Sequence, residues 1–81
     1  MNGEPDGNSY TQRLLSDRNL RVKKLGEEMA ELIASLCESD KDSIASEVAD
    51  VFYHVLVASR AEGVNLDAIR NVLWERMNNG K

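Results

Sequence analysis

Two acidic pairs, placed symmetrically about a predicted turn, constrain this 81-residue chain more than any other feature. Glu28 and Glu31 are three residues apart, as are Glu47 and Asp50, so on a helix the members of each pair lie side by side. If the chain reverses at residues 38–40, two antiparallel helices bring Glu28 level with Asp50. Glu31 is then level with Glu47, and all four carboxylates lie about 12 Å from the turn.

Each acidic pair also borders the apolar stripe of its helix. Glu28 lies three residues after Leu25 and four before Leu32, and Glu47 is flanked in the same way by apolar residues of its own helix. Carboxylates crowded into a partly dry site are unfavourable unless a cation neutralises them. Because every predicted ligand atom is an oxygen, the pattern predicts Mg²⁺, with Mn²⁺ possible and room for more than one ion.

Other interpretations of these residues stay open at the level of sequence. Acidic residues on helices are often simply solvated. A di-iron bundle would need Glu-x-x-His motifs, whereas the only histidine, His54, follows Asp50 by four residues. His54 can be structural, or it can lie beside the metal site or a phosphate. Glu27 can orient a water or a ligand, or pair with Lys23 or Lys24.

Apolar residues recur at intervals of three and four along most of the chain, and no strand-like alternation occurs. The pattern predicts an all-α fold with a disordered N-terminal arm at residues 1–8, one domain at residues 9–78 and a frayed tail at residues 79–81. The predicted helices start at Ser9 and about Leu20, with a break at residues 17–19. A Ser39-x-x-Asp42 pattern is expected to start the third helix.

Two further capping signals complete the expected helical pattern. Gly63 is expected to end the third helix, and Asn65 is expected to cap the fourth. Val64 and Ile69 are placed to form a hydrophobic staple at the start of that last helix.

The composition fits a small acidic protein of the cytoplasm. The net charge is −4 and 42% of the residues are hydrophobic, so we expect no nucleic-acid partner. No apolar run approaches the roughly 18 residues that span a membrane, and the first residues lack the apolar core of a signal peptide. The single cysteine, Cys37, is expected to be a buried thiol. A chain this short builds a marginal core, so helical hairpins are expected to form a four-helix-bundle-like homodimer.

A basic segment precedes the acidic pairs. It can be a solvated helix face, or it can be a phosphate cradle beside the metal, for which arginine is well suited. Its members are Arg13, Arg18, Arg21, Lys23 and Lys24.

Several motifs resemble those of the phosphoribosyl-ATP pyrophosphohydrolase family of histidine biosynthesis. They are S-Y-T at residues 9–11, K-K-L-G-E-E-M-A-E at residues 23–31, E-V-A-D-V-F-Y-H at residues 47–54 and G-V-N-L-D-A-I at residues 63–69. The combination E-E-x-x-E with E-x-x-D is shared by the wider MazG-type all-α nucleotide pyrophosphatases. The S-Y-T and Y-H motifs point to the narrower family.

The resemblance implies an enzyme that hydrolyses phosphoribosyl-ATP to phosphoribosyl-AMP and pyrophosphate, using Mg²⁺ and acting as a homodimer. It implies that the metal ligands are Glu28, Glu31, Glu47 and Asp50, with Glu27 supporting the attacking water or a second ion. Together with the basic segment, it implies that the residues near the substrate are Tyr10, Arg13, Lys24, Tyr53 and His54.

Two alternative functions remain consistent with the sequence. The first is a house-cleaning pyrophosphatase of the same superfamily that acts on free or damaged nucleoside triphosphates. The second is a non-catalytic helical dimerisation module whose acidic residues serve stability.

Overall fold

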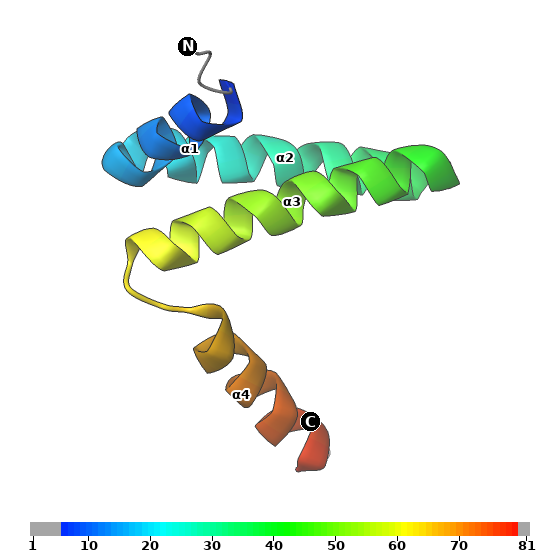
Figure 1. Ribbon diagram of the computed structural model, residues 1–81. Coiled ribbons are helices and arrows are strands. Elements are labelled where there is room, and N and C mark those ends of the chain that lie inside the picture. Colours follow the sequence, from blue (N-terminus) through cyan, green and yellow to red (C-terminus); the bar gives the residue numbers. More distant parts are fainter. Residues whose placement is uncertain (1–5, 80–81) are drawn as a thin grey trace.

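The computed structural model describes residues 6–79, with side chains from residue 9 onward. Within this range the chain forms four helices and no strand, which confirms the predicted all-α class: α1 (Asp6–Ser16), α2 (Arg18–Glu38), α3 (Lys41–Ala61) and α4 (Leu66–Asn78). Helices α2 and α3 lie side by side as an antiparallel hairpin (Figure 1). Helix α1 packs on both of them at the end away from their turn, and α4 stands apart.

The first helices extend further than the periodicity predicted. Helix α1 begins at Asp6 instead of Ser9, and the expected arm otherwise lies outside the described residues. The expected break at residues 17–19 is a single residue, Asp17, because its carboxylate accepts a hydrogen bond from the Leu20 N–H at 3.0 Å and caps α2. Helix α2 therefore starts at Arg18.

The turn between α2 and α3 lies at the predicted position, residues 38–40, but the residue that caps α3 differs from the prediction. Ser39 is in the left-handed conformation (φ 58°) and ends α2, its N–H donating to the Leu36 carbonyl at 3.2 Å. The prediction that Ser39 caps α3 was therefore wrong. Asp40, with extended backbone, is the cap, and its carboxylate accepts from the Ser43 N–H at 3.3 Å.

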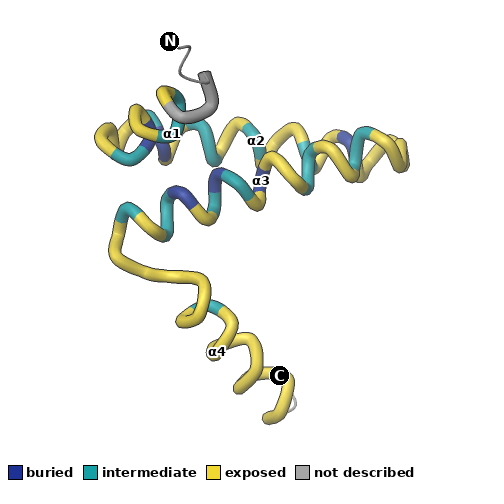
Figure 2. The backbone as a smooth tube through the Cα atoms, viewed as in Figure 1, coloured by how far each residue is buried: buried dark blue, intermediate teal, exposed yellow. Residues whose placement is uncertain are grey.

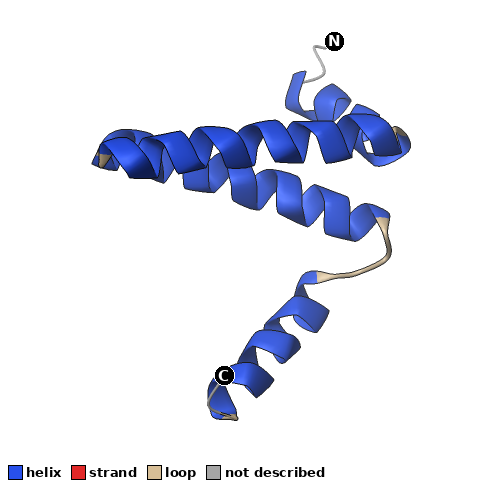
Figure 3. Cartoon of the chain, turned by 180° about the vertical axis from the view of Figure 1, so that it is seen from behind, coloured by secondary structure: helices blue, strands red, loops and turns tan. Residues whose placement is uncertain are grey.

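The turn between α3 and α4 confirms the two predicted capping residues, Gly63 and Asn65, while the staple between Val64 and Ile69 stays a prediction. Gly63 has a φ of 81°, and its N–H donates to the Arg60 carbonyl at 2.9 Å, while the Val64 N–H donates to the Ser59 carbonyl at 2.9 Å. This pair of bonds is a Schellman motif that ends α3. Asn65 then caps α4 by accepting from the Ala68 N–H at 2.9 Å. The loop is visible from behind in Figure 3.

A buried arginine ties α1 to the hairpin. Arg21 is 9% exposed, and one of its terminal nitrogens donates to the carbonyls of Leu14 and Leu15 at 3.2 and 3.1 Å. The other terminal nitrogen pairs with Glu62 at 3.2 Å. The sequence suggested either a solvated helix face or a phosphate cradle for the basic segment, and Arg21 fits neither. Its guanidinium instead binds carbonyls near the C-terminal end of α1 that have no partner within that helix.

The core of one chain is small and lies where α1 meets the hairpin. Among the described apolar residues, Leu14, Val51 and Val57 are buried. Figure 2 shows that α4 is exposed almost throughout. Cys37 is exposed, contrary to the prediction, because within residues 6–79 α1 packs at the opposite end of the hairpin and leaves this end of α2 uncovered. None of the helices in residues 6–79 is long and apolar enough to cross a membrane.

The two left-handed positions give opposite predictions for substitutions. Ser39→Gly should raise the free energy of unfolding by about 0.5 kcal/mol, since glycine adopts positive φ without strain. Gly63→Ala should lower it by about 1 kcal/mol through conformational strain alone, because an added Cβ meets no atom within 4 Å. Urea unfolding followed by circular dichroism measures both. Ser39→Ala, which keeps a Cβ at the same φ, is the control and should bring no gain.

Candidate metal centre

Three carboxylates from the two hairpin helices converge on one point. Glu28 of α2 and Glu47 and Asp50 of α3 each offer one oxygen, and these oxygens all lie within 4.8 Å of one another. Glu28 and Glu47 are half-buried, while Asp50 is exposed. The antiparallel register predicted from the mirrored pairs therefore brings acids from both helices together.

The fourth predicted ligand, Glu31, lies beside this group and acts on it electrostatically. Burial of the Glu47 carboxyl raises its pKa above the ordinary 4.5, and the negative charges of Glu31 and Asp50 raise the pKa further. Glu28 adds a smaller effect in the same direction. All four acids thus crowd one volume. Glu31 itself is exposed and is not among the three residues whose oxygens lie within 4.8 Å of one another.

The buried oxygens of this cluster suit a cation. The Oε1 atoms of Glu28 and Glu47 are shielded from solvent and have no hydrogen-bond partner. A buried carboxylate oxygen without a donor is unfavourable, and it becomes favourable when it coordinates a positive ion. An all-oxygen set of this kind fits Mg²⁺ or Mn²⁺.

Glu27 and Lys24 form an ion pair at the edge of the acids. Lys24 Nζ lies 3.3 Å from a carboxylate oxygen of Glu27, one of the two pairings open from the sequence. This hydrogen bond, together with the charge of Glu27, raises the pKa of Lys24, and Tyr10 and Glu28 add to the effect. Lys24 is therefore a cation within electrostatic reach of the metal centre. The predicted role of Glu27 toward a water stays a prediction.

An aromatic cluster joins α1 to α3 next to the acids. The Tyr10 hydroxyl lies 2.9 Å from His54 Nε2, and the Thr11 hydroxyl is hydrogen-bonded to the Tyr53 hydroxyl. The Tyr10 and Tyr53 rings stack with centroids 6.2 Å apart, and both meet His54 edge to face. Three predicted substrate residues thus sit together. Sequence reasoning gave no role to Thr11, whose only signal was its place in S-Y-T.

His54 and Arg13 differ sharply in exposure. His54 is 7% exposed and both ring nitrogens are hydrogen-bonded within the chain, while its predicted place beside a substrate stays a prediction. Arg13 is exposed on α1, and its role toward a substrate phosphate stays a prediction.

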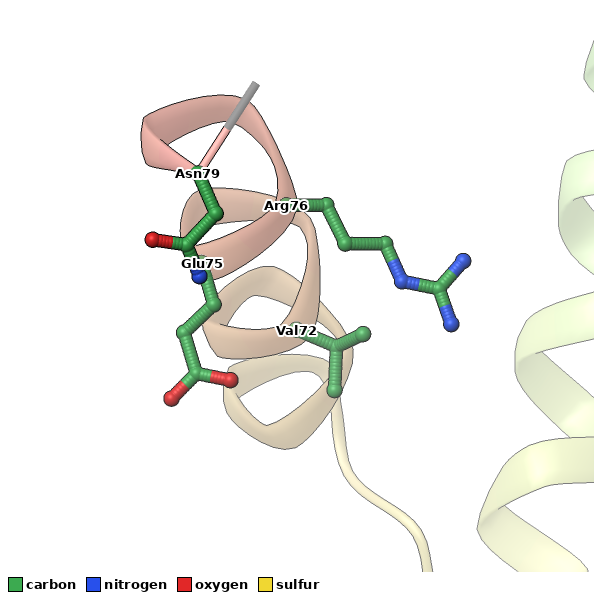
Figure 4. Close-up of a pocket in the computed structure, with 4 residues that line it drawn as sticks. All are labelled: Val72, Glu75, Arg76 and Asn79. Carbon is green, nitrogen blue, oxygen red and sulfur yellow. The ribbon is translucent and has the colours of Figure 1, made fainter. Parts of the chain in front are cut away.

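Several hollows lie away from the acids, around α4. One of about 590 Å³ is lined by Val72, Glu75, Arg76 and Asn79, as Figure 4 shows, and none of the four acids of the metal centre borders it. Another, of about 240 Å³, lies between α3 and α4 and is lined by apolar side chains only: Phe52, Val55, Leu56, Leu66, Ile69 and Leu73.

Comparison with known proteins decides the family. The family model described as phosphoribosyl-ATP pyrophosphohydrolase matches residues 2–77. This chain belongs to that family. The predicted resemblance is therefore confirmed, and it extends over almost the whole chain.

Similar proteins of the family come in two lengths. The chain is 45% identical over 74 residues to a phosphoribosyl-ATP pyrophosphatase of Caulobacter sp. (strain K31), covering 91% of this chain and 68% of the relative. It is 44% identical over 68 residues to that of Caulobacter vibrioides (strain NA1000 / CB15N), covering 84% and 64%. It is 42% identical over 73 residues to the histidine biosynthesis bifunctional protein HisIE of Synechocystis sp., covering 89% and 34%.

The chain thus spans about two thirds of the Caulobacter relatives and about one third of the bifunctional one. No solved structure matches the chain.

The crowded carboxylates predict an unusual pH dependence in chelator. Because the folded-state pKa of Glu47 is raised, its stabilising contribution is complete below the ordinary pKa of 4.5 and is lost as the pH rises through the folded-state value. The protein in EDTA should therefore have a lower melting temperature at pH 8 than at pH 5.5.

Glu47→Gln should flatten that dependence, because glutamine carries no charge. Glu38→Gln, at the exposed end of α2, removes a charge outside the cluster and should leave the dependence unchanged. Equal melting temperatures at the two pH values in the unsubstituted protein would contradict the crowding argument.

Proposed function

We propose that this chain hydrolyses phosphoribosyl-ATP to phosphoribosyl-AMP and pyrophosphate with the help of Mg²⁺, and that it does so in the cytoplasm as a step of histidine biosynthesis. The proposal is carried by family membership together with the convergence of acids that the reaction needs. The relatives named phosphoribosyl-ATP pyrophosphatase support the choice of substrate.

The acidic cluster supplies the binding site for the cation. Glu28, Glu47 and Asp50 are placed to hold it, with Glu31 beside them, and their negative charge is what a divalent ion offsets. When bound there, Mg²⁺ would supply charge neutralisation for the phosphates and for the leaving pyrophosphate. The hydrolysis consumes one water: its oxygen bonds to phosphorus as the anhydride P–O bond breaks, pyrophosphate leaves, and the released proton passes to solvent.

The cationic and aromatic residues around the cluster suit the rest of the substrate. Lys24 places an ammonium beside the acids, where it can contact a phosphate oxygen once the Glu27 pair opens. Arg13 is exposed on α1, whereas the guanidinium of Arg21 is buried and donates to a backbone carbonyl. Tyr10 and Tyr53 present partly exposed rings next to these charges.

We also propose that the protein is a homodimer. The hollow between α3 and α4 is entirely apolar, and its rim includes Phe52, Leu66 and Leu73, which are 65%, 56% and 56% exposed. Exposed apolar surface of this extent is typical of an interface. Trp74 of α4 is also a large apolar side chain that is 63% exposed. Because a single copy leaves α4 without a packing partner, a second copy is the occupant that completes the helical bundle.

Pyrophosphate release tests the activity. The protein should release pyrophosphate from phosphoribosyl-ATP with Mg²⁺, and much more slowly from ATP, dUTP and other triphosphates. Glu47→Gln should lower kcat/KM by more than about 100-fold, beyond the effect typical of a residue that only supports a metal ligand. Glu38→Gln is the matched control and should keep full activity.

The pattern of the results separates the alternatives. Equal or greater activity on other triphosphates would indicate house-cleaning chemistry at the same site. No Mg²⁺-dependent activity on any substrate, with melting temperature unaffected by Mg²⁺, would indicate a dimerisation module.

Sedimentation velocity tests the dimer. The unsubstituted protein should sediment at twice the 9.1 kDa mass of one chain. Leu73→Glu places a charge in the apolar hollow and should shift the species to the monomer. Asn71→Glu adds the same charge to α4 at a position that does not line that hollow, and it should leave the dimer intact. A monomeric unsubstituted protein at micromolar concentration would refute the proposed interface.

A further inference from the structure

His54 connects the metal centre to α1 through two hydrogen bonds. Its Nδ1 lies 2.8 Å from the backbone carbonyl oxygen of Asp50, and its Nε2 lies 2.9 Å from the Tyr10 hydroxyl. Because a carbonyl oxygen only accepts, Nδ1 must carry the proton. In the neutral ring Nε2 is then the acceptor, and the Tyr10 hydroxyl is the donor. The backbone carbonyl of Asp50 therefore sets the direction of both hydrogen bonds, from Tyr10 to His54 and from His54 to Asp50.

Packing holds the Tyr10 hydroxyl in place to make this bond. The Tyr10 ring stacks on Tyr53 and meets His54 edge to face, with ring centroids 5.9 Å apart. Tyr10 belongs to α1, whereas Tyr53 and His54 belong to α3. Helix α1, which carries Tyr10, also packs against α2. Tyr10 thus joins α1 to α3 at the end of the hairpin where α1 contacts both helices.

Apart from the backbone of α3, little holds the side chain of Asp50 in place. Its side chain is exposed, and among the side chains described, from residue 9 to residue 79, no hydrogen bond or ion pair holds its carboxylate. Its carboxylate oxygen nevertheless lies within 4.8 Å of those offered by Glu28 and Glu47. The position of that carboxylate therefore depends on the backbone of α3 at Asp50, which is the point where His54 makes its hydrogen bond.

We infer that Tyr10 and His54 are positioning residues that hold Asp50 at the cation site, so that the hydrogen bond between Tyr10 of α1 and His54 of α3 sets the affinity of the acidic cluster for Mg²⁺. The inference rests on the proposed metal site. Neither residue contacts the ion. They act by fixing the turn of helix that carries one of its ligands, as partners behind a metal ligand commonly do.

Isothermal titration with Mg²⁺ in the absence of substrate tests this inference. Tyr10→Phe keeps the stacked ring and removes only the hydroxyl, and it should raise the Mg²⁺ dissociation constant by about 10-fold. His54→Phe removes both hydrogen bonds and should raise it at least as much. If Tyr10 acts through His54, adding Tyr10→Phe to His54→Phe should have no further effect on the dissociation constant.

Thr11→Val is the control for a purely structural role. It removes the neighbouring hydrogen bond between α1 and α3, to Tyr53, without touching His54 or Asp50. It should lower the melting temperature and leave Mg²⁺ affinity within twofold of the unsubstituted protein. Circular dichroism at the titration temperature verifies that each variant is folded.

The outcomes separate this inference from the proposed function. Normal Mg²⁺ affinity in folded Tyr10→Phe would overturn the positioning role and leave the proposed metal site standing. Equal weakening by Thr11→Val would also overturn it, since loss of α1 docking would then act without His54. Absence of Mg²⁺ binding by the unsubstituted protein would overturn both the metal site and this inference.

Discussion

Mutual repulsion of carboxylates across the α2–α3 hairpin is the constraint on which the rest of the structure depends. Packing two amphipathic helices antiparallel is favourable because it buries apolar surface, but here the same packing brings an oxygen of Glu28 to within 4.8 Å of oxygens offered by Glu47 and Asp50. The raised pKa of Glu47 and the two buried oxygens without donors are direct consequences. Such crowding lowers stability, as is common where residues are retained for a function, and it supports the proposed role of the cluster in binding a cation.

Helix α1 and its contacts counter that repulsion at the other end of the hairpin. Arg21 reaches from α2 to the last carbonyls of α1 and to Glu62 beyond the end of α3. A guanidinium that satisfies three acceptors at once fixes the relative positions of the elements that carry them. The aromatic cluster around His54 makes a second attachment between α1 and α3. The acidic site is therefore held between the turn on one side and two polar attachments on the other.

Helix α4 differs from α1, because its N-terminal cap is complete while most of its side chains lack a packing partner. Asn65 and the Schellman turn at Gly63 fix where the helix begins, yet its side chains remain mostly exposed. Local capping stabilises a helix by about 1 kcal/mol and cannot replace the burial of an apolar face. The unfilled apolar hollow between α3 and α4 is thus the part of the fold that a single chain leaves unfinished.

The sequence by itself determined the helices, the place of the hairpin turn and the convergence of acids on one spot. These follow from periodicity, from glycine and asparagine at their usual capping positions, and from the mirrored spacing about position 39. Only the tertiary structure decided the roles of side chains that depend on a neighbour distant in sequence. Arg21 is buried because α1 folds back over it, Cys37 is exposed because none of the four described helices covers it, and His54 is fixed by Tyr10, 44 residues away. Periodicity reports which face of a helix is apolar, but it does not say which element covers that face.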